Sequence, residues 1–115
     1  MADETLEQTL LDPTRLSIVS LLAATTWAEF GFVRDAVGLT DSALSKQITT
    51  LTRLEFVEVD KGYVGKRPRT WLNLSDTGRA ALRRHIAALQ QIAARATDAG
   101  AAYGPDIATR RPRTA

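Results

Sequence analysis

The spacing of apolar residues predicts a chain built mainly from helices. In five segments an apolar side chain returns every three or four positions, which is the period of one helix face. These segments span about residues 3–11, 13–24, 30–37, 40–54 and 75–99. Asp12 before Pro13, Thr40 and Ser75 are good N-cap residues for three of the helices, and Gly38 stands where another should end. The segment at 3–11 is too short to be stable unless it docks on the others.

Two of these helices form a recognisable pair. The segments 30–37 and 40–54 are separated by a short turn that contains a glycine, which is the pattern of a helix-turn-helix. Apolar residues at 4 and 3 spacing predict the buried face of the longer one. The residues expected to face the core are Leu16, Val19, Leu22 and Ala23 in the helix at 13–24, and Leu44, Ile48 and Leu51 in the helix at 40–54.

A pattern of period two between residues 57 and 74 predicts one β-hairpin. Valines alternate with acids in its first part, and leucines alternate with Trp71 and Asn73 in its second. Gly62 and Gly65 permit a sharp loop between the strands, and Pro68 stiffens the chain that follows. We therefore expect a loop at about residues 60–70 that projects from the core.

The chain is expected to form one domain of the α+β class, mainly α with a single small hairpin. Its 115 residues are enough for one compact core and too few for two. Residues 1–99 are assigned to this domain. Residues 100–115 contain two prolines and no apolar period, so we expect a flexible basic tail there.

The last predicted helix is longer than a core of this size can cover, at roughly 37 Å for 25 residues. Its apolar stripe has the spacing of a helix-pairing seam, which favours a homodimer. Packing on the chain's own first helix is the alternative. The expected dimer interface comprises Leu6, Leu10, Leu82, Ile86, Leu89, Ala93 and Ala96. His85 lies beside this stripe, either as an ordinary interface histidine or as a pH sensor.

Composition argues against several classes of function. The chain has no cysteine and one histidine, so thiol chemistry, a histidine-based triad and a bound metal are not expected, and neither is any cofactor. We therefore expect no enzyme activity. No apolar run is long enough to span a bilayer, and residues 1–12 carry four acids and no basic residue, unlike a signal peptide. A cytoplasmic protein is the default expectation.

The net positive charge arises in the second half of the chain. All of the excess lies after residue 60, and residues 61–74 carry four basic residues and no acid. These are Lys61, Lys66, Arg67 and Arg69. The outer face of the helix at 40–54 is polar or small, which suits a helix that enters a DNA major groove. This candidate DNA-reading set is Thr40, Ser42, Ala43, Ser45, Lys46, Gln47, Thr49, Thr50 and Arg53. A merely solvated helix face and a solubilising turn are the alternatives.

Three segments together resemble bacterial regulators of the ArsR and MarR type. They are DPTRLSIVSLL, LTDSALSKQITTLTRLEFVEV and GKRPRTWLNLSDTGRAAL, and the match spans about residues 12–95. The chain is most similar to short winged-helix regulators whose wing reads G-x-x-P-x-T followed by L-[ST]-x-x-G. In this sequence the motif residues are Gly65, Pro68, Thr70, Leu74, Ser75 and Gly78. The resemblance implies a winged helix-turn-helix with N-terminal and long C-terminal dimerisation helices.

The resemblance also implies a function. A homodimeric regulator, most simply a repressor, would place one helix 40–54 per protomer in successive major grooves of a palindromic operator in double-stranded DNA. The loop at 60–70 would lie on the minor groove or its phosphates, with Arg67 as the candidate for entering the groove. Metal-sensing and oxidant-sensing relatives use cysteines, which this chain lacks. A winged-helix module that binds proteins rather than DNA remains the alternative function.

A small-molecule effector is a further expectation. Six of the seven aromatic residues lie between residues 27 and 71, and residues of this group could line a site for a flat apolar ligand. The candidate ligand-binding residues are Trp27, Phe30 and Trp71. The same aromatic residues could instead serve only to pack the core.

Overall fold

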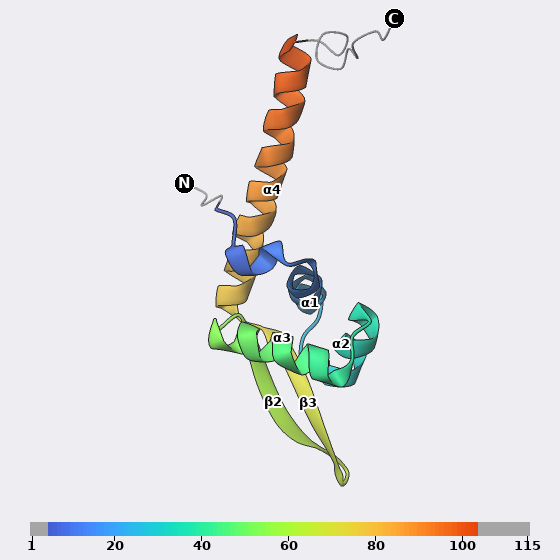
Figure 1. Ribbon diagram of the computed structural model, residues 1–115. Helices are drawn as coiled ribbons and strands as arrows, with labels where there is room; N and C mark the ends of the chain where they lie inside the picture. The colour runs from blue at the N-terminus through green and yellow to red at the C-terminus, as the bar shows by residue number, and fades with distance from the viewer. Residues whose placement is uncertain (1–4, 104–115) are drawn as a thin grey trace, which may run out of the picture.

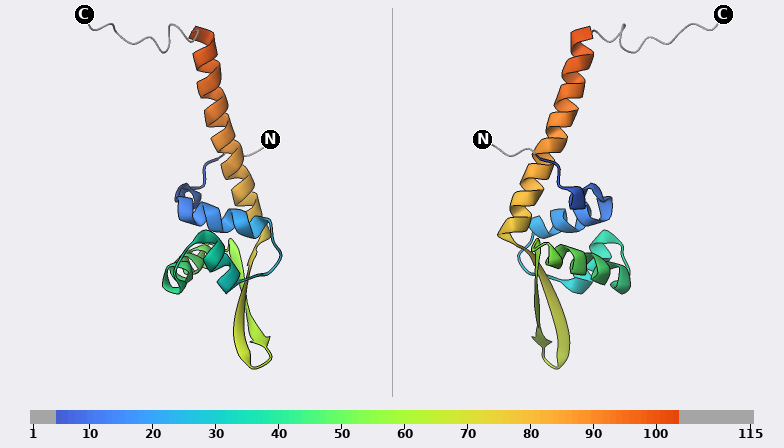
Figure 2. Two further views of the ribbon diagram at one scale, coloured as in Figure 1. Left: turned by 90° about the vertical axis from the view of Figure 1, so that its right-hand side faces the viewer. Right: turned by 60° about the vertical axis from the view of Figure 1, so that its left-hand side comes forward.

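The computed structural model describes residues 5–103 and contains one helical body with a projecting hairpin and one long helix (Figure 1). The elements in chain order are η1 (Gln8–Leu11), α1 (Pro13–Ala23), β1 (Ala28–Glu29), α2 (Phe30–Val37), α3 (Asp41–Arg53), β2 (Val57–Val64), β3 (Arg67–Leu74) and α4 (Asp76–Tyr103). The hairpin of β2 and β3 leaves the body on the side opposite to the free end of α4 (Figure 2). The predicted mainly helical α+β architecture with one hairpin is confirmed.

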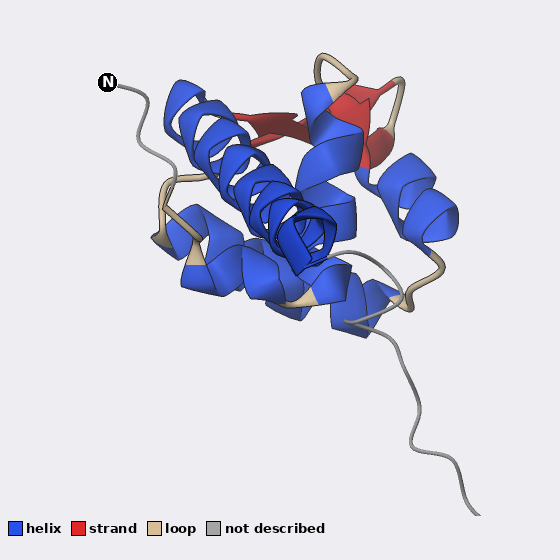
Figure 3. Cartoon of the chain, turned by 90° about the horizontal axis from the view of Figure 1, so that it is seen from above, coloured by secondary structure: helices blue, strands red, loops and turns tan. Residues whose placement is uncertain are grey.

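One hydrophobic core joins the helices to the base of the hairpin. Helix α1 contacts η1, α2, α4 and β3, and α3 packs on α2 and β2. Seen from above, the other helices lie around α4 (Figure 3). The fully buried side chains at the centre of this core come from η1, α1, α2, α3 and β3, and they include Leu10, Ile18, Val19, Leu22, Val33, Leu44, Leu51 and Leu72. The predicted inward stripes of α1 and α3 therefore do face the core, although Leu16 and Ala23 are only partly buried.

The predicted caps account for where the helices begin. The Asp12 carboxylate accepts a hydrogen bond from the Arg15 N–H at 3.0 Å, and the Thr40 hydroxyl accepts one from the Ala43 N–H at 3.1 Å. Ser75 does the same for Gly78 at 2.9 Å. Each cap satisfies an N–H group that has no partner inside its helix.

The predicted helix at 3–11 is wrong for the part that the structure describes. Only Gln8–Leu11 is helical, as a 3-10 turn, and residues 5–7 have no regular structure. Asp12 is extended, as the residue before a proline prefers, so the chain cannot run helically into α1. The backbone N–H of Glu7 bonds to Nδ1 of His85 instead. This segment is therefore held by α4 rather than by its own helix.

The hairpin is longer, and its loop shorter, than the sequence predicts. Strands β2 and β3 pair in antiparallel register from Val57 opposite Leu74 to Val64 opposite Arg67. The connecting turn is only Gly65 and Lys66, with Gly65 at a φ of 62°, which suits a glycine at the first turn position. The predicted loop residues 60–64 and 67–70 are thus strand residues.

A third strand was not predicted. Ala28 and Glu29 form β1, which pairs antiparallel with β3 opposite Leu72 and Trp71, so the strand order is β1-β3-β2. A strand of two residues is too short to show an alternation of apolar and polar positions. Its pairing also depends on a partner more than forty residues away in the sequence. This strand places the start of α2 beside the base of the hairpin.

Helix α4 ends later than predicted. It continues to Tyr103, so residues 100–103, which were assigned to the tail, are helical. The rest of the predicted tail, residues 104–115, lies outside the described residues. The first turns of α4 bury Gly78, Ala81, His85 and Ala88 against the body, while from Ile92 to Tyr103 every side chain is exposed apart from the intermediate Gly100 position. About half of the helix therefore extends beyond the core.

Candidate nucleic-acid interface

The outer face of α3 is open along its whole length. Thr40, Ser42, Ser45, Lys46, Thr49 and Arg53 are exposed, while Ala43, Gln47 and Thr50 are half-buried. Thr52, which the sequence analysis left out, is exposed on the same helix and borders the space beside the wing. The predicted reading set thus lies on one accessible surface, with Gln47 at its edge.

The two threonine hydroxyls at the centre of this face already use their hydrogens. Thr49 donates to the carbonyl of Ser45 at 3.0 Å, and Thr50 donates to that of Lys46 at 3.3 Å. A hydroxyl that donates to its own helix keeps oxygen lone pairs that can accept. This face therefore offers acceptors for the amino groups of cytosine or adenine, next to the Lys46 donor.

Gln47 is turned away from that face. Its side-chain oxygen lies 3.4 Å from a guanidinium nitrogen of Arg15 on α1. The amide is thus engaged with the protein, so we place it outside the base-reading set that the sequence predicted.

The β2–β3 hairpin, called the wing below, has two different faces. Cross-strand pairing and alternation place Val59, Lys61 and Tyr63 on the face that carries Thr70 and Leu72. This face looks at α3, because both elements line one cleft. The opposite face carries Glu58, Asp60, Val64, Arg67, Arg69 and Trp71. Positive charge therefore faces α3 at the root of the wing, and the exposed acids face away from it.

The four predicted wing cations occupy three different environments. Lys61 lies in the cleft beside α3, and Lys66 and Arg67 are exposed at the tip. Arg69 forms an ion pair with Glu29 of β1, with 3.5 Å between guanidinium nitrogen and carboxylate oxygen. Its charge is therefore already partly neutralised within the protein.

Tyr63 and Val64 complete the wing tip and were missed by the sequence analysis. Their exposed fractions are 74% and 58%, large values for apolar side chains. Tyr63 stands opposite Pro68 in the strand register. The alternation of the strand would have indicated this position if the turn had been placed at Gly65 and Lys66.

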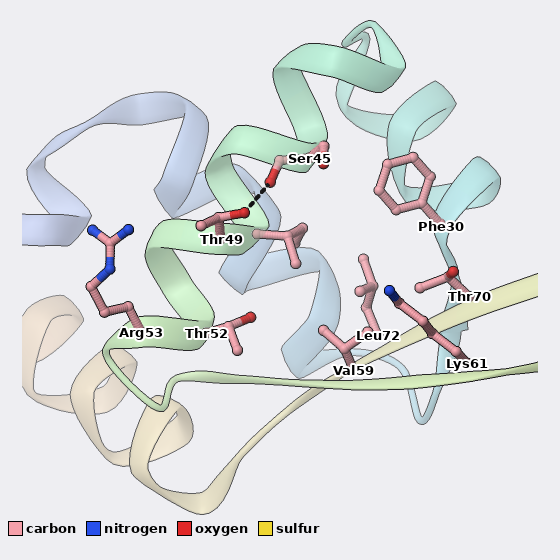
Figure 4. A pocket seen from close by; sticks show the side chains of 10 residues that line it. Phe30, Ser45, Thr49, Thr52, Arg53, Val59, Lys61, Thr70 and Leu72 are labelled. Carbon is pink, nitrogen blue, oxygen red and sulfur yellow. Dashed lines mark hydrogen bonds between the residues drawn. The ribbon is translucent and has the colours of Figure 1, made fainter.

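A cleft of about 650 Å³ separates α3 from the wing (Figure 4). Its lining consists of Phe30, Ser45, Ile48, Thr49, Thr52, Arg53, Val59, Lys61, Thr70 and Leu72, with no acidic side chain. Lys61 reaches from the wing toward the helix, and Arg53 lies at the other end of the cleft. The floor is apolar and the rim consists of hydroxyls and two cations. Such a surface suits a molecule that presents both anionic oxygens and apolar carbon.

Only one of the three predicted ligand-binding aromatic residues lines this cleft. Phe30 borders it, packed against the core. Trp71 lies on the opposite face of the wing, over Gly62, where an added Cβ would stand 3.3 Å from its ring. Trp27 is in the turn before β1, and its backbone N–H bonds to the Asn73 side chain at 3.3 Å. The structure thus does not bring the three together.

Arg34 ties the start of α3 to α2. Its guanidinium lies 2.8 Å from both Asp35 and Asp41. The hydrogen bonds that Arg34 donates to Asp35 and then to Asp41 raise the pKa of Arg34, and the bond that Asp35 accepts lowers the pKa of Asp35. Because Asp41 is engaged in this pair, the acid at the first turn of α3 is partly compensated where DNA would approach.

The predicted dimer residues divide between the protomer core and an open helix face. Leu10 is fully buried in the protomer's own core, so its assignment to the dimer interface is wrong. Leu82 packs partly against that core. Ile86 and Leu89 are each 37% exposed, and Ala93 and Ala96 are exposed beyond them. Ile92, which was not predicted, is 50% exposed next to this stripe. Leu6 is half-buried.

His85 is buried within the protomer rather than beside an open seam. Its exposed fraction is 1%, and Nδ1 accepts the hydrogen bond from the Glu7 N–H at 3.0 Å. The side chain therefore anchors the N-terminal segment on α4, which corrects its placement at a dimer interface.

Two further features concern residues 5–103, a possible metal site and a possible membrane span. No group of three or more histidine, aspartate or glutamate residues in this part of the chain is arranged to hold a metal ion. Across the same residues, no helix combines the length and the apolar character needed to cross a bilayer.

The family model described as winged helix DNA-binding domain matches residues 14–93, and the chain belongs to this family. A solved transcriptional regulator homologue from Pyrococcus horikoshii is 27% identical, with a TM-score of 0.72 over 78% of this chain and 89% of that one. The protein is therefore a winged-helix DNA-binding transcriptional regulator and not an enzyme.

Two further solved structures share the fold. The zinc-responsive MarR family member ZitR of Lactococcus lactis is 15% identical, with a TM-score of 0.57 over 90% of this chain and 69% of its own. The Mycobacterium tuberculosis regulator MOSR, solved in complex with DNA, is 20% identical, with a TM-score of 0.63 over 84% of this chain and 69% of its own. At these identities the likeness concerns the fold alone.

Proposed function

We propose that the protein is a homodimeric, sequence-specific repressor that binds a palindromic operator through α3 and the wing. In this proposal residues 40–54 enter the major groove and residues 60–70 lie on the adjacent minor groove and its phosphates. One observation carries it: the open polar face of α3 and the wing face that carries Lys61 border a single cleft whose lining contains no acid.

The chemistry of the cleft suits the DNA backbone that separates two neighbouring grooves. With α3 in the major groove and the wing tip at the minor groove, this strand must pass between them. Lys61, Arg53 and the Thr70 hydroxyl would then face phosphate oxygens, and the apolar floor would face deoxyribose. Such contacts fix the position of the protein, and the side chains of α3 read the bases.

The charge distribution of the wing supports one orientation on DNA. Glu58 and Asp60 are exposed on the face away from α3, and Glu29 pairs with Arg69 on the same side. If DNA lay against that face, the acids would repel the phosphates. DNA on the α3 side meets Lys61 first and the tip cations next.

The open face of α4 supports a homodimer. Ile86, Leu89 and Ile92 lie at three-residue spacing on a helix that extends beyond the body, and between 37% and 50% of each residue's surface is exposed in the protomer. Burying such a face against its symmetry copy gains roughly 25 cal/mol per Å² of apolar surface. A two-fold dimer of this kind presents two copies of α3, which matches operators with two half-sites about one helical turn apart.

Repression would follow from occupancy, because a dimer that covers two successive grooves excludes other proteins from the same promoter DNA. A small effector would act most directly in the cleft, since a molecule held between Phe30 and Lys61 occupies the space proposed for the backbone. Such a molecule would release the protein from DNA rather than recruit it.

Selection of binding sites from random duplexes tests the proposal. We expect the purified protein to enrich inverted repeats, and light scattering on the enriched complex to give two protomers per duplex. Enrichment of no sequence, together with weak binding to all duplexes, would contradict the proposal and favour the protein-interaction alternative.

A further inference from the structure

A chain of hydrogen bonds joins α4 to α3 through the N-terminal segment. The Glu7 N–H donates to His85 Nδ1 on α4 at 3.0 Å. Two residues further on, the Thr9 carbonyl accepts from Arg15 Nε at 2.8 Å. The same guanidinium lies 3.4 Å from the Gln47 side-chain oxygen on α3. We call residues 7–15 the strap, because they connect the two helices that carry the proposed dimer and DNA surfaces.

The α4 end of the strap is firmly fixed. His85 is 1% exposed and Leu10 is fully buried in the core. The Glu7 carboxylate also accepts a hydrogen bond from the Thr9 N–H, which shapes the short 3-10 turn. Detachment of Glu7 would leave the buried His85 Nδ1 acceptor without its donor, so this end is not expected to detach easily.

The α3 end of the strap depends on Arg15. Its backbone N–H caps α1 through Asp12, and its side chain, 28% exposed, spans from the Thr9 carbonyl to Gln47. The principal packing partners of α3 are β2 and α2, which belong to the winged-helix body. The Arg15–Gln47 contact therefore adds a lateral link from α3 toward the part of the chain held by α4.

We infer that Arg15 is a positioning residue, which fixes the orientation of α3 relative to α4 and so the half-site spacing that the dimer accepts. The inference rests on the proposed function, since it concerns two copies of α3 on one duplex. Each added base pair moves a half-site by about 3.4 Å and rotates it by roughly one tenth of a turn. A rigid link between α3 and α4 would reject such a change, and a loosened one would tolerate it.

The orientation of Gln47 also agrees with this role. Glutamine is a good partner for adenine in the major groove, yet here its amide contacts Arg15 on the protein side. Gln47 then contributes to the placement of α3 rather than to base reading. Arg15 acts through Gln47 and touches no base itself.

The test uses the palindrome that the wild-type protein itself selects, together with duplexes that carry one or two extra central base pairs and a duplex with a single half-site. Fluorescence anisotropy measures each affinity. We expect an insertion to weaken wild-type binding by about tenfold or more, because the second half-site is no longer reached in register.

Arg15→Met keeps the apolar stem and the backbone cap but removes the guanidinium. Its affinity for the single half-site should be within about twofold of the wild-type value. Its affinity for the palindrome should fall by less than about threefold when base pairs are inserted. Arg83→Met, the same change at an exposed position of α4, should behave as wild type. A variant that is merely unstable would lose half-site affinity as well, and its spacing preference would not change selectively.

A second pair of variants approaches the same link from α3. Gln47→Leu should relax the spacing preference, and Gln47→Glu, which keeps an acceptor for Arg15, should retain it even if overall affinity falls. If Arg15→Met and Gln47→Leu both keep the full wild-type loss on insertion, the inference is wrong and the proposed dimer function stands. If wild-type binding itself does not depend on the spacing of the half-sites, both the inference and the proposed dimer function are wrong.

Discussion

The guanidinium of Arg69 on β3 lies 3.5 Å from the carboxylate of Glu29 on β1. Both side chains are more than a third exposed, so the pair is screened by solvent and adds little to stability. Its importance is for binding, because it engages one of the four wing cations before DNA arrives. The number of basic residues in the wing therefore overstates the charge available to phosphates.

Replacing Glu29 and replacing Arg69 should change the affinity for DNA in opposite directions. Glu29→Gln removes a carboxylate and leaves the Arg69 charge uncompensated on the wing face away from α3, so affinity should rise by up to a few fold through longer-range attraction, without the slope increase of about 0.9 that a new phosphate contact would give. Arg69→Gln should change affinity by less than Lys61→Gln does. Anisotropy titrations over a range of salt concentrations measure both, and equal losses for Arg69→Gln and Lys61→Gln would contradict this view of the wing.

Thr49 should affect which sequence is bound rather than how tightly DNA is bound in general. Thr49→Val keeps the shape of the side chain and removes the oxygen that we expect to accept from a base. Discrimination at one operator position should fall by roughly 1–3 kcal/mol, while affinity for random DNA stays within about twofold. Site selection from random duplexes measures this.

Thr97→Val is the matched control for that experiment, since Thr97 on α4 makes the same bond to the carbonyl four residues earlier. It should leave the selected sequence unchanged. Uniform weakening by Thr49→Val across all duplexes would instead assign Thr49 to phosphate contact.

A charge on the open face of α4 should prevent dimerisation. Leu89→Glu places a carboxylate at the centre of the stripe formed with Ile86 and Ile92, where a partner helix would have to desolvate it. Light scattering should give the mass of a monomer, and affinity for the full palindrome should fall to that of a half-site. Gln90→Glu, an exposed neighbour, should remain dimeric. A dimer that survives Leu89→Glu would place the interface elsewhere.

Gly78 is required by a close approach between α4 and the chain after α3. A Cβ at this position would collide with the Phe56 carbonyl and stand 2.6 Å from a Leu74 methyl group. Gly78→Ala should therefore lower the free energy of unfolding by about 1–3 kcal/mol in urea titrations. Gly100→Ala, where a Cβ meets nothing within 4 Å, should instead be neutral or stabilise by up to about 1 kcal/mol. Equal effects of the two changes would refute the steric explanation.

Local signals in the sequence were sufficient to predict α1, α2 and α3. Their caps at Asp12 and Thr40, the left-handed Gly38 and the Leu44–Ile48–Leu51 stripe all depend on residues within one or two turns. The L-[ST]-x-x-G motif was noted as a resemblance, and the structure supplies its physical reason. Ser75 caps the Gly78 N–H, and its hydroxyl also bonds to the Phe56 carbonyl, which only a glycine at 78 lets come so close.

Features that depend on distant partners could not be predicted in this way. Strand β1 exists through its pairing with β3, and the strap through the bond from Glu7 to His85, 78 residues apart. The arrangement of the charged residues in the candidate site could not be predicted for the same reason. Sequence identified Lys61 and Arg69 as wing cations, but only the strand register shows that they lie on opposite faces and that Glu29 engages one of them.

Salt-dependent anisotropy on the selected palindrome and a shuffled duplex tests DNA binding by α3 and the wing most directly. Wild type should bind the palindrome roughly a thousandfold more tightly than the shuffled duplex. The double variant Lys66→Gln with Arg67→Gln should have a shallower dependence of affinity on salt on both duplexes, by about the amount expected for the loss of two phosphate contacts. Weak binding of wild type to both duplexes, or a slope that the double variant leaves unchanged, would contradict the proposed interface.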